Sequence, residues 1–382
     1  TATAGSDYTN SLEVWNPAAN NGAGAWQPYT PGTFIHIPAD GDATNAEPTT
    51  LLVRVPIKAD TPLDGGETFT LTATNTGGTA ATGTGTIVDD GTGTLFATRA
   101  DDPATPANEA VAGVQPANGS DPAAPLTLTP TSAAVADPNA TTNPAILADD
   151  DRPLTVNNVT VNEGSPFAVF TVGGKEGQYV NLGLNPGTAT AGSDYTNSLE
   201  VWNPAANDGA GAWQAYVPGT FVSIPTDGDA TNAEPANLLV RVPIKQDDEF
   251  EGAHTFTLNA TNTGGTTTTG TGTILDDSTG TLFGPANTTG TPDLPGQNGI
   301  PAAFTKDDDR PLDINNVTVN EGSPFAVFTI TAMEGRSLQL SLGSGNATIG
   351  QDTGTQLEVF NGTTWVDYTP GSSFPPGHLR QQ

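Results

Sequence analysis

Short runs of apolar and β-branched residues, separated by turn residues, make up most of the chain. The run LLVRVPI at 238–244 places Val240, Val242 and Ile244 on one face of an extended segment. The run FAVFTV at 167–172 likewise has one apolar face. Apolar residues do not recur at the spacing of a helix, so the pattern predicts an all-β protein.

The same alternation predicts seven or eight short strands between residues 149 and 283. A sequence of short strands without helical segments is typical of an antiparallel β-sandwich. Pro243 lies inside one of the runs and predicts an edge or bulge position, because proline has no N–H to donate to a neighbouring strand. The predicted strands are Leu154–Asn162, Phe167–Val172, Val180–Leu184, Leu199–Trp202, Phe221–Ile224, Leu238–Ile244, Thr255–Thr261 and Gly270–Leu275.

Long motifs return along the chain and divide it into repeats. Three of them return unchanged: TATAGSDYTNSLEVWNPAAN at 1–20 and 188–207, DDDRPL at 149–154 and 307–312, and VNEGSPFAVFT at 161–171 and 319–329. Only the middle copy contains every motif. The predicted division is a partial repeat without its first strands (1–96), an insert (97–148), a complete repeat (149–283), a second insert (284–306), and a partial repeat without its last strands (307–382).

Both inserts are rich in Ala, Pro, Thr, Asn and Asp, which indicates linkers or surface loops. Within the longer one, APLTLTPTSAAV at 124–135 could form an extra strand. The composition does not decide between disorder and a strand there.

The charge balance narrows the classes of partner. The chain has 42 acidic and 11 basic residues, a net charge of −31, and this excludes a nucleic-acid groove or an anionic membrane surface as the expected partner. The chain has no cysteine, which excludes disulfides and zinc–thiolate sites. No apolar run approaches the ~20 residues needed to span a bilayer. The acidic balance favours cations as ligands.

Four motifs in order resemble the Calx-β domain. The middle copy carries them as VNEGSPFAVFTV, TATAGSDY, VRVPIKQDDEFEGAHTF and GTGTILDD. The first copy matches from its AGSDY turn onward, and the third copy matches up to that turn. The resemblance implies tandem immunoglobulin-like antiparallel β-sandwiches, extracellular or at the cell surface. It also implies calcium held by acidic loops at one tip of each sandwich.

The resemblance assigns candidate calcium ligands in each copy. The middle copy offers Glu163, Asp194, Asp247, Asp248, Glu251, Asp276 and Asp277; the first offers Asp7, Asp60, Asp64, Glu67, Asp89 and Asp90; the third offers Glu321 and Asp352. Calcium takes about 6–8 oxygen ligands. Gln246, Ala59, Thr61 and His254 stand where the family pattern has acids, so weaker binding or fewer ions are expected. The alternative interpretation is that these acids are solvated turn residues.

Other candidate sites are weaker. The acidic stretch DGDATNAE at 40–47 and 227–234 lacks the later spacing of an EF-hand and is interpreted as a polar hairpin loop. Histidines do not recur in the repeat unit, since His36 and His254 each align with another residue type, and we expect no enzyme activity. Tryptophan-containing loops could form a sugar-stacking platform or cover an edge of the sandwich. They contain Trp15, Trp26, Trp202, Trp213 and Trp365.

These observations predict a structural repeat region of a secreted or cell-surface protein. Its role would be spacing, adhesion or the building of an extracellular fibre, with calcium making the acidic loops rigid. The alternative is a carbohydrate- or protein-binding module that uses its tryptophan loops.

The incomplete outer copies allow two interpretations. The sequence is a stretch of a longer array, or the early strands of the third copy complete the first copy of a neighbouring chain and build a head-to-tail filament. Residues 346–382 would then duplicate residues that the acceptor already has, which favours the first interpretation.

Overall fold

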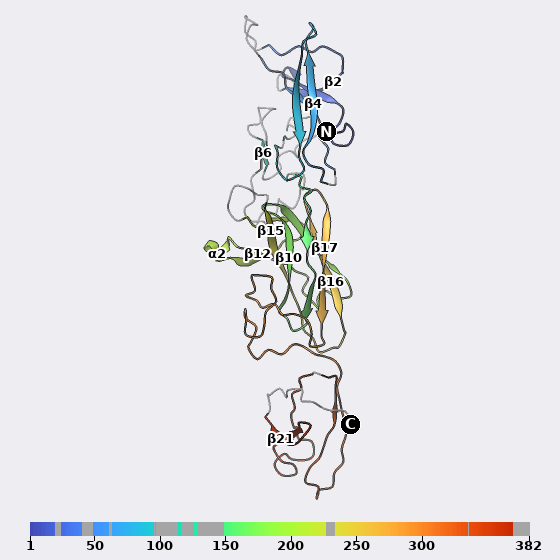
Figure 1. Ribbon diagram of the computed structural model, residues 1–382, viewed down its shortest axis with the longest axis vertical. Helices are drawn as coiled ribbons and strands as arrows, with labels where there is room; N and C mark the ends of the chain where they lie inside the picture. The colour runs from blue at the N-terminus through green and yellow to red at the C-terminus, as the bar shows by residue number, and fades with distance from the viewer. Residues whose placement is uncertain are drawn as a thin grey trace.

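The computed structural model describes most of the three repeats. Figure 1 shows β-rich units that follow one another along the long axis, with the middle unit between the other two. The described residues are 1–19, 24–39, 49–60, 63–94, 96, 149–226, 234–334 and 336–369, with the backbone of two short strands at 114–116 and 126–128.

The middle repeat is a sandwich of two sheets. Its strands are β8 (Thr155–Val156), β9 (Val159–Asn162), β10 (Phe167–Lys175), β11 (Tyr179–Pro186), β12 (Glu200–Asn203), β13 (Ala212–Ala215), β14 (Phe221–Ser223), β15 (Pro235–Pro243), β16 (His254–Thr261) and β17 (Thr267–Leu275). One five-stranded sheet has the order β13-β12-β15-β10-β8, and the other has the order β14-β11-β16-β17-β9. Neighbours are antiparallel except β9 and β17, which run parallel. The predicted all-β fold of immunoglobulin-like sandwiches is confirmed.

Two details differ from the prediction. The single strand expected at 154–162 is split into β8 and β9, which belong to different sheets. Between them the side chains of Asn157 and Asn158 accept hydrogen bonds from Thr171 and Thr271 in the two sheets, and so hold the crossing. The strand β13 was not predicted, because AWQA has little alternation; it pairs with β12 through the turn α2 (Ala206–Gly209).

The prediction for Pro243 was wrong. Pro243 ends β15, which lies between β12 and β10 in the interior of its sheet rather than at an edge. Its carbonyl oxygen accepts a hydrogen bond from the N–H of Thr196. Because the ladder with β10 ends at this residue, the missing N–H of proline leaves no gap inside the sheet.

Aromatic rings join the two sheets of the middle repeat. Phe170 meets Phe256 edge-on with ring centroids 5.8 Å apart, and Tyr195 stacks on Phe256 at 4.7 Å. A Cβ at Gly272 would lie 2.5 Å from the Phe256 ring, so the ring fits there only because glycine has no side chain. The GTGT run at 270–273 is therefore part of a strand that packs under an aromatic ring.

The second insert, 284–306, folds as a loop against the outer face of the sheet. Arg241 points outward from β15, forms a 2.6 Å ion pair with Glu200, and lies 4.4 Å from the centroid of the Trp213 ring. Carbonyl oxygens of Pro285 and Asn287, both in the insert, accept hydrogen bonds from Arg241 and Trp213. Of the two interpretations offered for this segment, the structure has the surface loop.

The outer repeats contain shorter sheets. The first has β1 (Leu12–Asn16), β2 (Ala25–Tyr29) and β3 (Val53–Arg54) in one sheet, and β4 (Glu67–Thr74) paired with β5 (Ala80–Ile87). The third has the pairs β18 (Asp313–Ile314) with β19 (Ile330–Thr331), and β20 (Leu357–Phe360) with β21 (Trp365–Tyr368). Apolar side chains that the middle repeat buries are exposed here, as Phe328 is at 52%.

In the long insert, backbone pairing joins β6 (Val114–Pro116) to β7 (Leu126–Leu128). The strand β7 falls within 124–135, where the sequence left an extra strand open. Across the described residues, no helix combines the length and apolar character needed to cross a membrane.

Phe170→Ala and Phe328→Ala change the same position of the VNEGSPFAVFT motif in two repeats. The first removes a ring that is fully buried and should lower the free energy of unfolding of the middle repeat by about 3–5 kcal/mol. The second removes an exposed ring, and its effect should stay within about 0.5 kcal/mol. Urea unfolding followed by tryptophan fluorescence measures both, and equal losses would contradict the difference in burial.

Candidate metal centre

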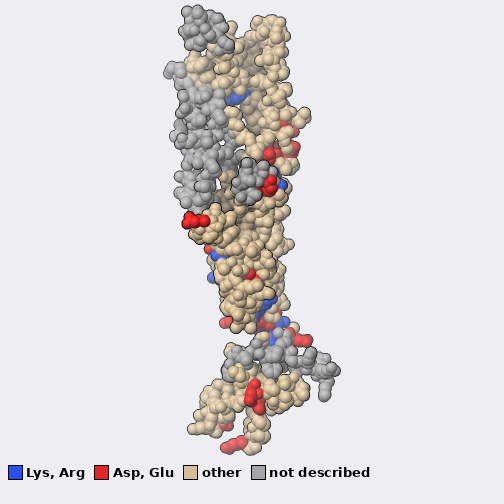
Figure 2. All heavy atoms as spheres, turned by 60° about the vertical axis from the view of Figure 1, so that its left-hand side comes forward, with Lys and Arg blue, Asp and Glu red and all other residues tan. Residues whose placement is uncertain are grey.

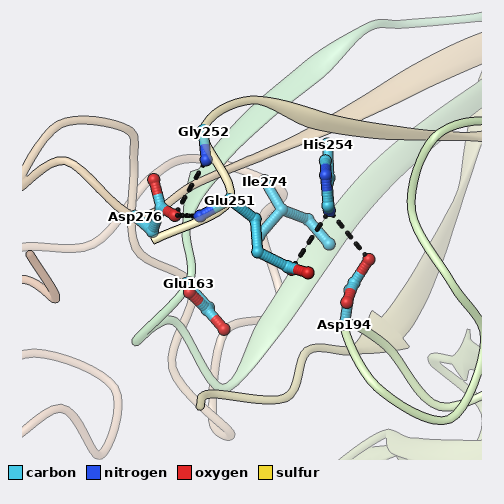
Figure 3. A pocket seen from close by; sticks show the side chains of 7 residues that line it. All are labelled: Glu163, Asp194, Glu251, Gly252, His254, Ile274 and Asp276. Atoms are coloured by element: carbon cyan, nitrogen blue, oxygen red, sulfur yellow. Dashed lines mark hydrogen bonds and ion pairs between the residues drawn. The ribbon is translucent and has the colours of Figure 1, made fainter. Parts of the chain in front are cut away.

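Four acidic side chains meet at one end of the middle sandwich because of its strand order. β9 and β17 are parallel neighbours, with Asn162 opposite Leu275, so the next residues, Glu163 and Asp276, leave the sheet side by side. Asp194 comes from the loop between β11 and β12, and Glu251 from the loop between β15 and β16. Figure 3 shows these four side chains around one pocket, whose lining is completed by Gly252, His254 and Ile274.

Asp276 is the most buried acid of this group, with 3% of its surface exposed. Its Oδ2 accepts hydrogen bonds from the backbone N–H groups of Glu251 (2.7 Å) and Gly252 (3.0 Å). Its Oδ1 is buried and has no hydrogen-bond partner among the described residues. A buried charged oxygen without a partner is costly, so this atom marks a place for a cation or an ordered water.

Glu163 is also buried, at 7% exposed. Its Oε1 accepts the backbone N–H of Asp247 at 3.0 Å. Burial, together with the negative charges of Asp247, Asp307 and Asp309, raises the pKa of Glu163 to about 8. The carboxylate form therefore needs a compensating positive charge.

His254 stands between two of the acids. Its Nδ1 lies 3.1 Å from Asp194 Oδ2 and 3.3 Å from Glu251 Oε2. The three side chains bring ligand atoms within 4.8 Å of one another. His254 therefore places a ring nitrogen beside two carboxylates, where the first repeat has the carboxylate of Glu67.

The other three predicted ligands of the middle repeat are not among the residues that line this pocket. Asp247 is half-buried, and its Oδ1 accepts the N–H of Glu249. Asp248 is exposed. Asp277 accepts hydrogen bonds from the N–H and hydroxyl of Thr279 and so caps its own turn.

The first repeat gathers its own acidic group. Carboxylate oxygens of Asp7, Asp60 and Asp64 lie within 4.8 Å of one another. A hydrogen bond to Asp7 is the main cause that raises the pKa of Glu67, which occupies the position of His254. Asp89 accepts the N–H of Asp64 at 2.8 Å, as Asp276 does from Glu251.

Three predicted ligands lie outside these groups. Asp90 has the same arrangement as Asp277, since its Oδ1 accepts hydrogen bonds from the N–H and the hydroxyl of Thr92. In the third repeat, Glu321 and Asp352 are exposed and belong to none of the acidic groups formed by the described residues. Asp352 accepts a hydrogen bond from the N–H of Thr348 in its own loop at 2.8 Å.

Asp307 and Asp309, which were not among the predicted ligands, lie beside Glu163 in the structure. One oxygen each from Asp307 and Asp309 lies within 4.8 Å of an oxygen of Glu163. Burial and the neighbouring Asp309 raise the pKa of Asp307 to about 6. Both belong to the recurring DDDRPL motif, and that recurrence was the available signal.

The tryptophans pack across their own hairpins. Trp202 meets Trp213 at 5.6 Å, and Trp15 meets Trp26 at 5.5 Å, both edge-on. Trp365 lies 5.6 Å from the Phe360 ring. These contacts favour the interpretation that the tryptophans cover an edge of the sheet. The acidic stretch at 40–47 lies outside the described residues, as does 227–234 apart from Glu234.

The stability of the cation-free protein should fall as pH rises. Burial raises the pKa of Glu163 in the folded chain from its usual 4.5 to about 8, so the folded chain holds this proton more tightly than the unfolded chain. Stability from Glu163 is therefore present below about pH 4.5 and is lost as pH rises to about 8. Melting in chelator across this window measures the effect, and Glu163→Gln should flatten it. A melting temperature that rises with pH would contradict the assignment.

Comparison with known proteins gives similarity in structure only. No protein-family model matches the chain, and no curated protein matches its sequence. The chain is similar to the apo form of the Calx CBD1 domain, with 20% identity and a TM-score of 0.19 over 32% of this chain and 97% of that domain. It is similar to the calcium binding domain CBD12 of CALX1.1, with 19% identity and a TM-score of 0.21 over 33% of this chain and 46% of that structure. The chain thus spans less than half the length of the second structure.

Proposed function

We propose that this chain is a calcium-binding structural repeat region of a secreted or cell-surface protein. One observation carries the proposal: Glu163, Asp194, Glu251 and Asp276 converge from four loops, and one oxygen of the buried Asp276 has no hydrogen-bond partner in the part of the chain that the structure describes. If these acids were only turn residues, their side chains would remain solvated and far from one another.

The donor set favours calcium among the common metal ions. It is rich in carboxylate oxygen, which suits hard cations, and His254 supplies the one ring nitrogen of the pocket. Calcium accepts irregular sets of about 6–8 oxygens from flexible loops, whereas magnesium requires a near-ideal octahedron. Carboxylates, loop carbonyls and waters would complete its shell.

The proposed role is mechanical rather than catalytic. The pocket lies at the end of the sandwich, beside the chain segment that leads to the next repeat, so a bound ion stiffens the joint of an array. Extracellular calcium modules bind the ion in the 10⁻⁴–10⁻³ M range, and Gln246 and His254 in place of two acids favour this weaker range. An acidic chain without cysteine, built from tandem sandwiches, suits a spacer, an adhesive stalk or a fibre outside the cell.

Calcium should raise the melting temperature of the chain relative to chelator. At a hundredfold excess over its dissociation constant, a ligand stabilises the folded state by about 2.7 kcal/mol. Asp194→Asn with Glu251→Gln should remove most of this shift for the middle repeat. Asp208→Asn, an exposed acid in the turn α2, is the matched control and should keep it.

His254→Glu gives the middle repeat the residue that the first repeat has at this place, and it should strengthen calcium binding. An unchanged melting temperature on adding calcium to the wild-type chain would overturn the proposed function. Calorimetric titration with calcium chloride distinguishes weak binding from none.

The exposed apolar faces of the outer repeats support association between copies, as in the proposed head-to-tail fibre. In the third repeat Phe325, Val327 and Phe328 are each more than half exposed, and in the first repeat Phe34 is 73% exposed. Sedimentation velocity should show larger species as concentration rises, and Phe325→Ser with Phe328→Ser should abolish them. A wild-type chain that stays monomeric at high concentration would defeat this part of the proposal.

A further inference from the structure

The two outer repeats together contain the strands of one complete sheet. In the middle repeat one sheet has the order β13-β12-β15-β10-β8. Among the described residues, the first repeat has the order β2-β1-β3, which corresponds to β13-β12-β15, and the third repeat has the pair β19-β18, which corresponds to β10-β8. Placed side by side, the two partial sheets reproduce the order of the complete one.

Each partial sheet also has the register of the complete one. Glu13 lies opposite Arg54 in β1 and β3, as their counterparts do in β12 and β15. Ile314 lies opposite Ile330 in β18 and β19, again as their counterparts do in β8 and β10. In the described part of the outer repeats, the one ladder of this sheet without a counterpart is that between β10 and β15.

The two segments that would form this ladder have the same sequences in the middle and outer repeats. LLVRVPIK occurs at 51–58 and at 238–245, and FAVFT occurs at 325–329 and at 167–171. In the middle repeat these two sequences pair as the antiparallel strands β15 and β10. The outer copies can therefore form the same ladder with each other.

The first repeat has two rings of a three-ring aromatic cluster. Tyr8 and Phe69 stack with centroids 5.0 Å apart, as their counterparts in the middle repeat do at 4.7 Å. The third ring of the middle cluster is Phe170, which is fully buried. Its counterpart in the third repeat is Phe328, which is 52% exposed. A strand of the third repeat placed beside β3 would bring Phe328 to the Phe69 ring.

A pair of rings around an arginine is divided between the outer repeats in the same way. In the middle repeat the guanidinium of Arg241 lies 4.0 Å from the centroid of the Phe167 ring and 4.4 Å from that of Trp213. In the first repeat the corresponding arginine lies 4.6 Å from the Trp26 ring. The counterpart of Phe167 is Phe325 of the third repeat, which is 64% exposed. The same pairing would place this ring over the arginine, where a cation–π contact is favourable.

The two segments can meet without burying a carboxylate. The chain has a net charge of −31, yet residues 51–57 contain a single arginine and no acid, and residues 325–330 contain no charge. On the face that Figure 2 shows, the described surface of the outer repeats is mostly that of uncharged residues. Pairing therefore avoids the cost of desolvating an unpaired acid.

The partner must be a second copy of the chain. Within one chain the first and third repeats lie at opposite ends, with the middle repeat between them (Figure 1). The hairpin β20–β21 pairs with no other strand among the described residues, so it can remain outside a shared sheet. Its counterparts β12 and β13 form no ladder with β10 in the middle repeat.

We infer that residues 325–331 of one chain pair with β3 of a second copy, as β10 pairs with β15. The register places Phe328 opposite Val53 and Thr329 opposite Leu52. The inference rests on the association between copies proposed above, and it names the strands, their order and their register. Addition of a strand to a sheet edge is a known mode of recognition, and a head-to-tail contact that does not close builds an open chain of copies.

Two aspartate variants test the direction of the contact. Val53→Asp blocks the accepting strand, and Phe328→Asp blocks the donating strand. The counterparts of both residues are fully buried in the middle repeat, whereas in the free chain Val53 is half-buried and Phe328 is exposed. In sedimentation velocity each variant alone should be a monomer. An equimolar mixture should form dimers and nothing larger, because it joins one intact donor to one intact acceptor.

The matched control is Thr70→Asp. It adds the same charge at an exposed position of β4 and should associate as the wild type does. Far-ultraviolet circular dichroism equal to that of the wild type checks that each variant folds.

A disulfide between two chains tests the register. The N–H and carbonyl of Thr329 bond to Asn315, on the side away from the acceptor, so Thr329 and Leu52 form a pair without mutual backbone hydrogen bonds. Side chains of such a pair lie closest and suit a disulfide. The chain has no cysteine, so Leu52→Cys mixed with Thr329→Cys should give a linked dimer under mild oxidation.

Val327→Cys provides the shifted control, because its side chain would lie diagonally from Leu52. A diagonal separation of about 7–8 Å is too long for a disulfide, so the matched mixture should link about tenfold faster than the shifted one. Gel electrophoresis without reductant measures both rates.

The outcomes separate this inference from the proposals on which it rests. A wild-type chain that stays monomeric at high concentration overturns both the strand pairing and the proposed association, and leaves calcium binding standing. A wild-type chain that associates overturns only the strand pairing if the aspartate variants associate equally well, if their mixture stays monomeric, or if the matched cysteines link no faster than the shifted ones.

Discussion

The close approach of like charges at the ends of the strands is the constraint on which this structure depends. β9 and β17 run parallel as neighbours, so Glu163 and Asp276 leave the sheet together and become buried where water cannot screen them. A buried pair of carboxylates is stable only with a proton or a cation between them. The fold thus creates a need for positive charge at the end of the middle sandwich.

The packed core of the middle repeat stabilises this arrangement of acids. Phe170, Phe256 and Tyr195 pack between the sheets and fix the strand ends from which the acids project. Real proteins depart from local energetic preference at functional sites and compensate for it elsewhere. Where the same motifs lack partner strands, as around Phe328, the apolar face is exposed and the predicted ligands stay apart.

Sequence copies need not have identical chemistry. Glu67 shares a hydrogen bond with Asp7, while His254 at the same place lies between Asp194 and Glu251. An all-oxygen group suits a hard cation directly, whereas an imidazole offers a proton-dependent substitute for it. The two copies therefore place different donor atoms on one scaffold.

The sequence by itself determined the all-β fold, because alternation is a local property of the chain. From its recurring motifs it also predicted the repeat boundaries and the acids Glu163, Asp194, Glu251 and Asp276 as calcium ligands. Only the tertiary structure decided which acids meet. Asp307 and Asp309 join Glu163 through pairing across an insert, and Asp277 turns away because neighbouring residues of a ladder face opposite sides. Pro243 is tolerated in a strand inside its sheet because it is the last residue of that strand, where no backbone N–H is needed. The periodicity of the sequence shows on which face of a strand a side chain lies. The side chains that it meets there depend on how distant segments of the chain pair.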